Sequence, residues 1–350
     1  MVMVPASHED FLKKFIKERQ VMKEHEKDEV LLIENNLRFV MFPIKYHEIW
    51  AAYKKLEASF WTSEEIELSK DVEDLESKFS AEQKETLGRL LAMLTVSEQI
   101  IKNQLIMKFS AELQNPEGKS FYGFEIMMNT IYEEIYSTMI DTFFDGPKNI
   151  PIFKKVSKMP EMKAMEEFLD RWIRNPDSLY AERLVALAAK EGIFYSGARA
   201  AIFSITQNGV MPGLHTANKN IFRDMGVYTD FSCLLFAHLK YKPDPKIIDK
   251  IITEAVEVEK NMLDKVLEVE KFGVDAAQIK QYVEFLADSL LGSFGNDKHY
   301  NVSNPFEFME GTTSIGKSTF FEKQVSDFTK ANETSQKASV QEAFSFNESF

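Results

Sequence analysis

The sequence predicts an all-α protein, a bundle of long helices that ends in a disordered C-terminal tail. Apolar residues recur over long stretches at the i, i+3, i+4 and i+7 spacing of one helix face. Glycine and proline, which interrupt helices, number only 14 and 11 among the 350 residues. The alternation of apolar and polar residues that is typical of strands is rare. Together these observations favour long helices joined by few turns.

The composition excludes several classes of function. The 42 basic and 55 acidic side chains give a net charge of −13, which disfavours nucleic-acid binding because that requires a basic surface. The single cysteine, Cys233, has no partner for an internal disulfide, as expected in a reducing compartment. No apolar stretch approaches the roughly 20 residues that cross a bilayer, and Met1–Lys13 lacks the apolar segment of a secretory signal. We therefore expect an intracellular protein that binds neither membranes nor nucleic acid.

The first part of the chain leads into the helical region. Residues 1–27 are highly charged with mixed signs, which predicts either a solvated surface helix or a frayed arm. The segment 39–44 is apolar and contains Pro43, so we expect a connection that is tucked against the protein. A helix is predicted to follow near residues 47–60.

The central part of the chain carries the long helical patterns. In the stretch 81–113, Leu87, Leu90, Leu91 and Leu94 share one helix face. Helices are predicted over 81–113, 120–145, 180–207 and 214–239, and amphipathic stretches follow at 246–271 and 275–293.

The end of the chain has a different composition. From Ser326 the apolar pattern stops, and Thr329–Val340 is too polar to order itself by burial. The last residues nevertheless include Phe344, Phe346 and Phe350, which are costly to expose. We expect a docking peptide here; the alternative is a frayed terminus with incidental aromatic residues. The predicted organisation is a charged arm (1–27), a helical domain (28–325) and a flexible tail (326–350).

Four apolar helical stretches can be compared with the ligand pattern of a ferritin-like bundle, and Glu98 and Glu191 match its two lone carboxylates. Ferritin-like di-iron proteins take one carboxylate from each of two helices and a Glu-x-x-His pair from each of two others. None of the six histidines follows a glutamate by three residues, so the pairs are missing. The equivalent positions hold Asn129 with Tyr132 and Met225 with Tyr228.

The residues at these positions are poor iron ligands. Asn129 offers a neutral carbonyl, and Met225 offers a thioether that is too soft for iron of this kind. Tyr132 and Tyr228 offer phenols whose ordinary pKa is near 10. The sequence therefore predicts that this chain binds no metal. Glu125, one turn before Asn129, is either a substitute ligand or, as we expect, a residue at the solvent or interface end of its helix.

Two carboxylates buried without a metal need a neighbouring cation or a proton. Arg199 follows Glu191 by eight residues and so shares its helix face two turns on. Our hypothesis is that Arg199 or Lys190 compensates the charge of Glu98 and Glu191. The alternative is that Arg199 is an ordinary surface residue.

Several runs of the sequence carry a resemblance to a known family. They resemble the small subunit of eukaryotic class I ribonucleoside-diphosphate reductase over essentially the whole chain. Within that family the sequence is similar to the metal-deficient second small subunit of budding yeasts, which pairs with a competent one. The matching runs are Arg38–His47, Glu57–Thr62, Phe121–Phe124, Glu191–Phe194, Met211–Leu214, Asn304–Met309 and Phe320–Lys323, together with the Phe-ended tail.

The resemblance implies roles for individual positions. It makes Tyr136 the position of the radical tyrosine and makes Trp61 and Asp224 relay positions. The next relay position, normally Tyr, is Phe328, which has no hydroxyl proton to lose. Arg199, like Tyr195, stands where the family usually has Phe beside the radical. The ligand positions that the resemblance assigns are Glu98, Asn129, Tyr132, Glu191, Met225 and Tyr228.

The resemblance also implies a function. We expect a non-catalytic small subunit without a cofactor of its own, which forms a heterodimer with an iron-binding small subunit and supports that subunit's di-iron and tyrosyl-radical assembly. It is expected to reside in the nucleus and cytoplasm. One alternative is an active radical-generating subunit with an atypical metal site, and another is a homodimeric scaffold. The tail is expected to dock the large subunit, for deoxyribonucleotide synthesis, through Phe344, Phe346, Glu348 and Phe350.

Overall fold

The computed structural model describes most of the helical unit that spans residues 1–315. The described residues are 17, 19–34, 38–144, 150–266, 268–306 and 309, and within them the side chains of 97–103, 150, 265 and 266 are left out. The tail predicted from residue 326, including Phe328, Phe344, Phe346, Glu348 and Phe350, lies outside the described residues.

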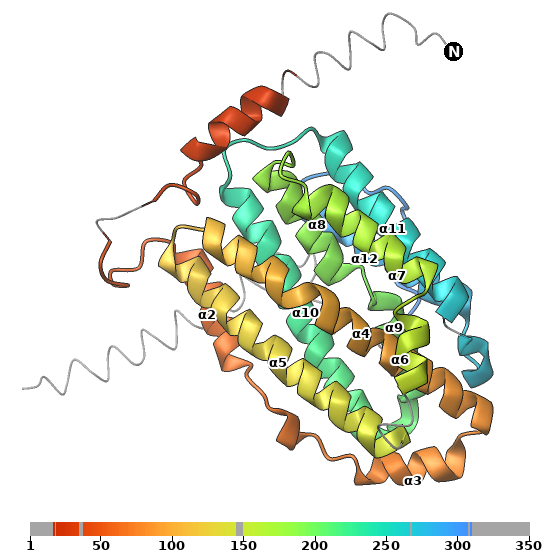
Figure 1. The fold of residues 1–350 in the computed structure, drawn as a ribbon. Coiled ribbons are helices and arrows are strands. Elements are labelled where there is room, and N and C mark those ends of the chain that lie inside the picture. The colour runs from red at the N-terminus through yellow and green to blue at the C-terminus, as the bar shows by residue number, and fades with distance from the viewer. Residues whose placement is uncertain are drawn as a thin grey trace, which may run out of the picture. The chain divides into compact units, whose positions relative to one another are not determined.

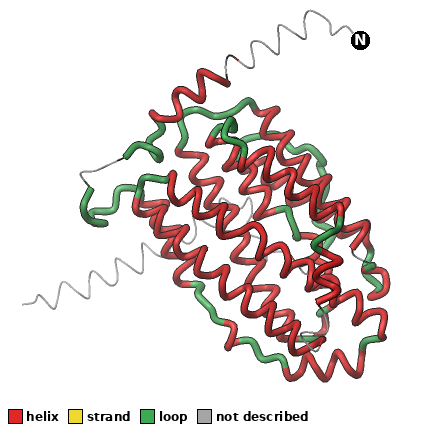
Figure 2. Tube along the Cα trace, viewed as in Figure 1, coloured by secondary structure: helices red, strands yellow, loops and turns green. Residues whose placement is uncertain are grey.

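The described part of the chain contains helices and no strand, so the predicted all-α class is confirmed (Figures 1 and 2). None of its helices is long and apolar enough to cross a membrane. Short 3₁₀ turns lie at Glu26–Asp28, Ser63–Glu65, Gln207–Gly209 and Val269–Phe272, and a π-helical turn lies at Asp170–Arg174. The α-helices are α2 (His47–Ala58), α3 (Ser69–Lys78), α4 (Ala81–Glu112), α5 (Pro116–Phe144), α6 (Ile150–Val156), α7 (Pro160–Leu169), α8 (Tyr180–Gly192), α9 (Ser196–Ile205), α10 (Pro212–His238), α11 (Pro245–Val266) and α12 (Ala276–Ser293).

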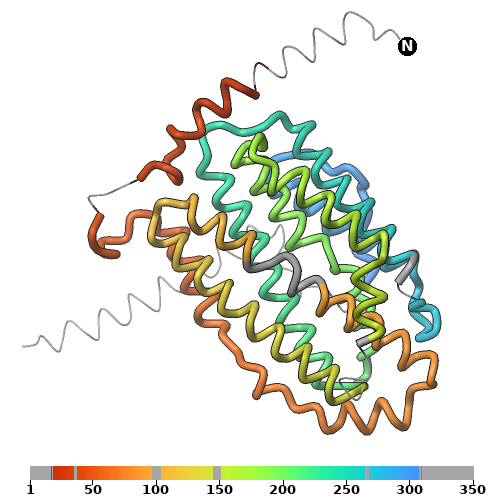
Figure 3. Tube along the Cα trace, viewed as in Figure 1, coloured from red at the N-terminus to blue at the C-terminus, as the bar shows by residue number. Residues whose placement is uncertain are grey.

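Helices α4, α5, α8 and α10 form the central bundle (Figures 1 and 3). Helix α4 packs along α5, and α10 packs along α8 and also contacts α5. The rings of Phe121 on α5 and Phe231 on α10 stack with their centroids 3.6 Å apart, and both side chains are buried. Helix α2 covers α5 and α10, while α11 and α12 cover α8 and α9. The apolar faces recognised in the sequence therefore meet in one core.

Local side-chain contacts fix where the central helices begin. Ser80 accepts a hydrogen bond from the Gln83 amide and Gln83 accepts one from the Ser80 amide, which forms a capping box at the start of α4. At the start of α10, the buried Asp71 of α3 accepts from the amides of Gly213 (2.8 Å) and Leu214 (2.6 Å). A carboxylate also complements the positive end of the helix dipole. Helix α3, which the sequence pattern did not reveal, thus holds α10 in place.

The helix predicted over 180–207 is two helices, α8 and α9. The break lies at Tyr195, whose φ of 63° is left-handed and cannot continue a helix. Glu259 of α11 accepts from the amides of Tyr195 (2.9 Å) and Gly197 (3.2 Å) at the start of α9. The apolar periodicity continues through the break, which is why the sequence did not show it.

The segment 39–44 connects to α2 as predicted, but the expectation that it is tucked was wrong for the isolated chain. Phe39, Val40 and Phe42 are 86%, 67% and 66% exposed. The base of the segment is fixed because the Arg38 guanidinium donates to both carboxylate oxygens of Glu117, at 2.8 and 2.6 Å. A firmly held loop therefore presents three large apolar side chains to the surroundings.

Candidate functional site

The four central helices carry all six of the ligand positions implied by the resemblance. Helix α4 carries Glu98, whose side chain lies outside the described residues. Of the other positions, α5 carries Asn129 and Tyr132, α8 carries Glu191, and α10 carries Met225 and Tyr228; all five of these side chains are buried.

Two of these ligand positions, Tyr132 and Tyr228, meet Asp224 in a network of hydrogen bonds. The hydroxyls of Tyr132 and Tyr228 lie 2.8 Å apart, and the Tyr132 hydroxyl donates to the Asp224 carboxylate at 2.8 Å. Burial, and after it the charge of Asp224, raises the pKa of both phenols well above 10. Both tyrosines therefore remain protonated at neutral pH and act as hydrogen-bond donors rather than as anionic ligands.

The same carboxylate is held by two further residues. The Trp61 indole nitrogen donates to Asp224 at 2.9 Å, and the Trp61 and Tyr132 rings stack with centroids 5.9 Å apart. Arg223 donates twice to the other carboxylate oxygen, at 3.0 and 2.9 Å. Burial raises the pKa of Asp224, while the Arg223 charge opposes this shift. The implied relay positions Trp61 and Asp224 are thus in direct contact, although they lie far apart in the sequence.

Glu191 is paired with a cation from its own helix. The Lys190 ammonium donates to a Glu191 carboxylate oxygen at 2.6 Å, and both side chains are buried. Glu191 also lines a small cavity of about 10 Å³, close to the room that one water molecule needs. Arg199 and Met225 line the same cavity, so α8, α9 and α10 meet around it.

Arg199 points into the bundle, so the alternative that it is a surface residue was wrong. Its side chain is 2% exposed, and its guanidinium donates to the Tyr136 hydroxyl at 2.8 Å. The Asn218 side chain of α10 donates to the Arg199 carbonyl at 3.0 Å, which ties α9 to α10. The structure therefore places one fixed positive charge at the implied radical tyrosine and a second cation, Lys190, at Glu191.

The two remaining polar residues of this face of α5 are buried. Asn129 is 1% exposed, and within the described part of the protein neither its side-chain nitrogen nor its side-chain oxygen has a hydrogen-bond partner. Glu125 is 2% exposed, so its expected place at the solvent or interface end of the helix was wrong. It lies in the core one turn from Asn129.

Two charged residues near the site were not singled out in the sequence. Arg223 forms an ion pair with Asp224. The sequence feature that could have predicted this pair is that the two residues are adjacent in the chain. Glu259 holds the α8–α9 break, and burial raises its pKa to about 7. Its signal was a carboxylate on the otherwise apolar face of α11, where Ala255 and Val256 precede it and Met262 follows.

Comparison with known proteins identifies the family. The sequence model of "Ribonucleotide reductase, small chain" matches residues 38–305. The chain is 60% identical to ribonucleoside-diphosphate reductase small chain 2 of Saccharomyces cerevisiae, over 98% of this chain and 99% of that protein. It is 50% identical to small chain 1 of the same organism, over 98% of this chain and 87% of that protein.

A solved structure agrees with these matches. A ribonucleotide reductase homodimer from Saccharomyces cerevisiae superposes with a TM-score of 0.82 at 61% identity, covering 92% of this chain and 99% of that one. A ribonucleotide reductase R2 subunit from Clostridium botulinum, at 18% identity and a TM-score of 0.69, shares the fold. The predicted ferritin-like bundle is thereby confirmed, and this chain belongs to the small-chain family of ribonucleotide reductase.

Proposed function

We propose that this chain is a non-catalytic small subunit of ribonucleotide reductase, which pairs with an iron-binding small subunit and assembles no di-iron centre of its own. The observation that carries the proposal is the Lys190 ammonium bound to the Glu191 carboxylate at a family ligand position. This cation neutralises the charge that a metal ion would otherwise neutralise.

The described donors do not fit a pair of iron ions. A metal ion at Glu191 would face the Lys190 charge at close range, where like charges repel strongly in a low-dielectric interior. Binding through Tyr132 or Tyr228 would require the loss of a phenolic proton whose pKa is raised well above 10. It would also break the bonds that join Tyr132 to Tyr228 and Asp224. The repulsion by Lys190, the loss of a phenolic proton and the loss of these hydrogen bonds each cost free energy. Iron binding through a Glu-x-x-His pair would not incur these costs.

The environment of Tyr136 also disfavours a radical. The Arg199 guanidinium donates to its hydroxyl at 2.8 Å, and a positive charge at this distance opposes the removal of an electron from the phenol. We therefore expect Tyr136 to remain an ordinary buried tyrosine. Phe328, at the outer relay position, adds a second break in the radical path.

A partly exposed aromatic stripe on α2, on α5 and on the segments that flank α2 supports pairing with another small subunit. Neighbouring rings run in the order Phe42, Trp50, Tyr53, Phe124 and Phe60, each 5.0 to 6.3 Å from the next between centroids. Phe42 and Phe60 are 66% and 48% exposed. Aromatic residues are enriched in the cores of protein interfaces, and tryptophan and tyrosine are frequent among the few residues that dominate the binding energy. The homodimeric state of the Saccharomyces relative further supports pairing through the small-subunit fold.

Native mass spectrometry of this chain mixed with an iron-binding small subunit tests the pairing. We expect a heterodimer, and we expect Phe42→Glu with Phe60→Glu to weaken it at least tenfold because each side chain would be buried against the partner. Gln278→Glu on α12, which is exposed and lies outside the stripe, is the control. A dissociation constant that the stripe variant leaves unchanged would refute this surface as the interface.

The proposal has two further parts, which concern the radical yield of the partner subunit and the docking of the large subunit. It is expected to yield more tyrosyl radical on the partner subunit than that subunit yields alone. The tail residues Phe344, Phe346, Glu348 and Phe350 are proposed to dock the large subunit. Deletion of 343–350 should then abolish capture of the large subunit while leaving the heterodimer intact.

A further inference from the structure

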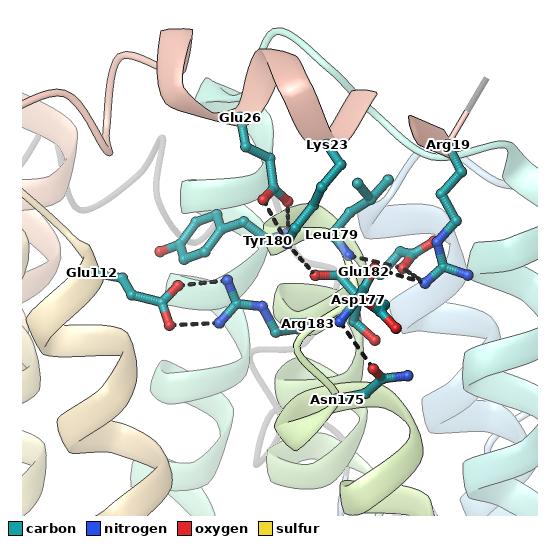
Figure 4. Close-up of polar contacts among 11 residues, drawn as sticks. Arg19, Lys23, Glu26, Glu112, Asn175, Asp177, Leu179, Tyr180, Glu182 and Arg183 are labelled. Carbon is teal, nitrogen blue, oxygen red and sulfur yellow. Dashed lines mark hydrogen bonds and ion pairs between the residues drawn. The ribbon is translucent and has the colours of Figure 1, made fainter. Parts of the chain in front are cut away.

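The described N-terminal residues 19–31, here called the N-terminal strap, contact the start of α8 (Figure 4). Glu26 of the strap accepts a hydrogen bond from the Tyr180 amide. The Lys23 ammonium donates to the Ser178 carbonyl at 2.9 Å. Because the first amides of a helix have no partner within the helix, Glu26 serves as a cap supplied from a distant part of the chain.

A partly buried ion pair adds to this contact. The Arg19 guanidinium bonds to Glu182 of α8 at 2.6 Å, and the Glu182 side chain is only 2% exposed. The same carboxylate accepts from the Leu179 amide at 3.0 Å, so it joins the strap to the first turn of the helix. In Figure 4 the strap side chains point down onto this turn, beside Arg183, which bonds to Glu112 at the end of α4.

The strap also holds the chain at the end of α10. Glu29, which is 2% exposed, accepts from the amides of Lys240 (2.9 Å) and Tyr241 (2.8 Å) directly after the helix. The His25 ring stacks on Tyr241 with centroids 5.0 Å apart. One segment of the strap therefore reaches both α8 and α10.

The strap also contacts the turn between α4 and α5. The Gln114 amide in this turn donates to the Leu31 carbonyl at 2.8 Å, and the Leu31 side chain is fully buried. The strap thus bonds to one end of every helix of the central bundle: the start of α8, the end of α10, and the turn that ends α4 and begins α5. These four helices carry all the ligand positions of the pocket.

We propose that the N-terminal strap is a conformational device that closes this end of the bundle, and that its release loosens α8 and the end of α10 without unfolding the opposite end. Glu26 and Glu29 are the main contacts of the strap, because Glu26 accepts from one helix-end amide and Glu29 from two. The opposite end is held separately by Asp71, through the Gly213 and Leu214 amides. The two ends are therefore able to open independently.

Hydrogen exchange of the full chain, followed by mass spectrometry, tests the strap. In the double variant Glu26→Gln with Glu29→Gln, we expect at least tenfold faster exchange in peptides covering 179–183 and 239–242. Peptides covering 211–215 should exchange as in the parent chain. Glu24→Gln, an exposed glutamate of the same segment, is the matched control and should change nothing.

Two outcomes would overturn the proposal. One is unchanged exchange at 179–183 and 239–242, and the other is an equal rise at 211–215, which would indicate global destabilisation. Should the double variant fail to fold, Arg19→Met removes only the contacts of Arg19 with the Glu182 carboxylate and the Asp177 carbonyl. It should speed exchange at 179–183 alone. Because the isolated chain is measured, the outcome is independent of pairing and of metal content.

Discussion

The Lys190–Glu191 pair is the single contact on which the proposed metal-free pocket depends most. Both side chains are buried, so each charge is costly without the other. We expect Lys190→Met to lower the free energy of unfolding by about 3–5 kcal/mol, because it leaves a buried carboxylate without a cation. Lys190→Met combined with Glu191→Gln should recover most of this loss. Urea unfolding measures both variants, and equal stability of the single variant and the parent chain would contradict the pairing.

Glu259 gives the molecule a dependence of stability on pH. Burial raises its pKa from 4.5 to about 7 in the folded state, so the folded chain binds a proton that the unfolded chain releases. The unfolding free energy therefore falls as pH rises from about 4.5 to about 7, by up to about 3 kcal/mol from this group. Glu259→Gln, which carries no charge, should flatten the curve in this window. Urea unfolding at pH 5, 6, 7 and 8 checks this, and a curve with the parent slope would remove Glu259 as the cause.

At the scale of elements, the start of α10 depends on a close approach of backbone atoms. A Cβ atom at Gly213 would lie 2.3 Å from the Glu67 carbonyl oxygen, so Gly213→Ala must displace the segment before α3. We expect a loss of about 1–3 kcal/mol of stability. Gly123→Ala, at an exposed helical glycine with open space around it, should instead add about 0.5–1 kcal/mol. Thermal unfolding compares the two variants, and similar midpoints for both would contradict this account of the α3–α10 junction.

The sequence predicted the elements that local patterns specify and missed those that depend on contacts between residues distant in the chain. Helices such as α4 and α10 follow from periodic apolar residues and agree with the predicted ranges within two residues at each end. The break at Tyr195 depends on Glu259, which lies 64 positions away, so no local pattern revealed it. The exposure of Phe39 and Phe42 was missed because composition cannot distinguish an apolar segment that is buried in its own chain from one that is available to a partner.

The same limit applies to the candidate site. The sequence predicted that Tyr132 and Tyr228 stand at ligand positions, and the resemblance named Asp224 as a relay position. It did not show that the two phenols and this carboxylate form one network, because α5 and α10 meet only in the folded bundle. The resemblance placed Arg199 beside the radical position, and our hypothesis made it a candidate cation for the glutamates. Its hydrogen bond to the Tyr136 hydroxyl was not predicted. Lys190 is the cation at Glu191.

At the scale of the whole molecule, the helical frame matches the family fold, whereas the pocket inside it holds side chains that suit iron poorly. The core, the Asp71 and Glu259 helix caps, and the N-terminal strap hold four helices in the arrangement of a ribonucleotide reductase small chain. Inside that frame, the phenols of Tyr132 and Tyr228 stand at two implied ligand positions, and Lys190 bonds to the carboxylate at a third, Glu191. The proposed partner role needs the frame and an exposed apolar surface, which Phe42 and Phe60 provide in the described part of the protein. It does not need donors that hold iron.

The most direct test of this account is the metal content and radical signal of the purified chain. The chain alone is mixed with ferrous iron and oxygen, bound iron is counted, and the electron paramagnetic resonance spectrum is recorded. We predict substoichiometric iron and no tyrosyl radical, because Lys190 neutralises Glu191 and Arg199 bonds to Tyr136. Near-stoichiometric iron with a tyrosyl radical would contradict the central claim and show that this chain is itself a radical-generating subunit.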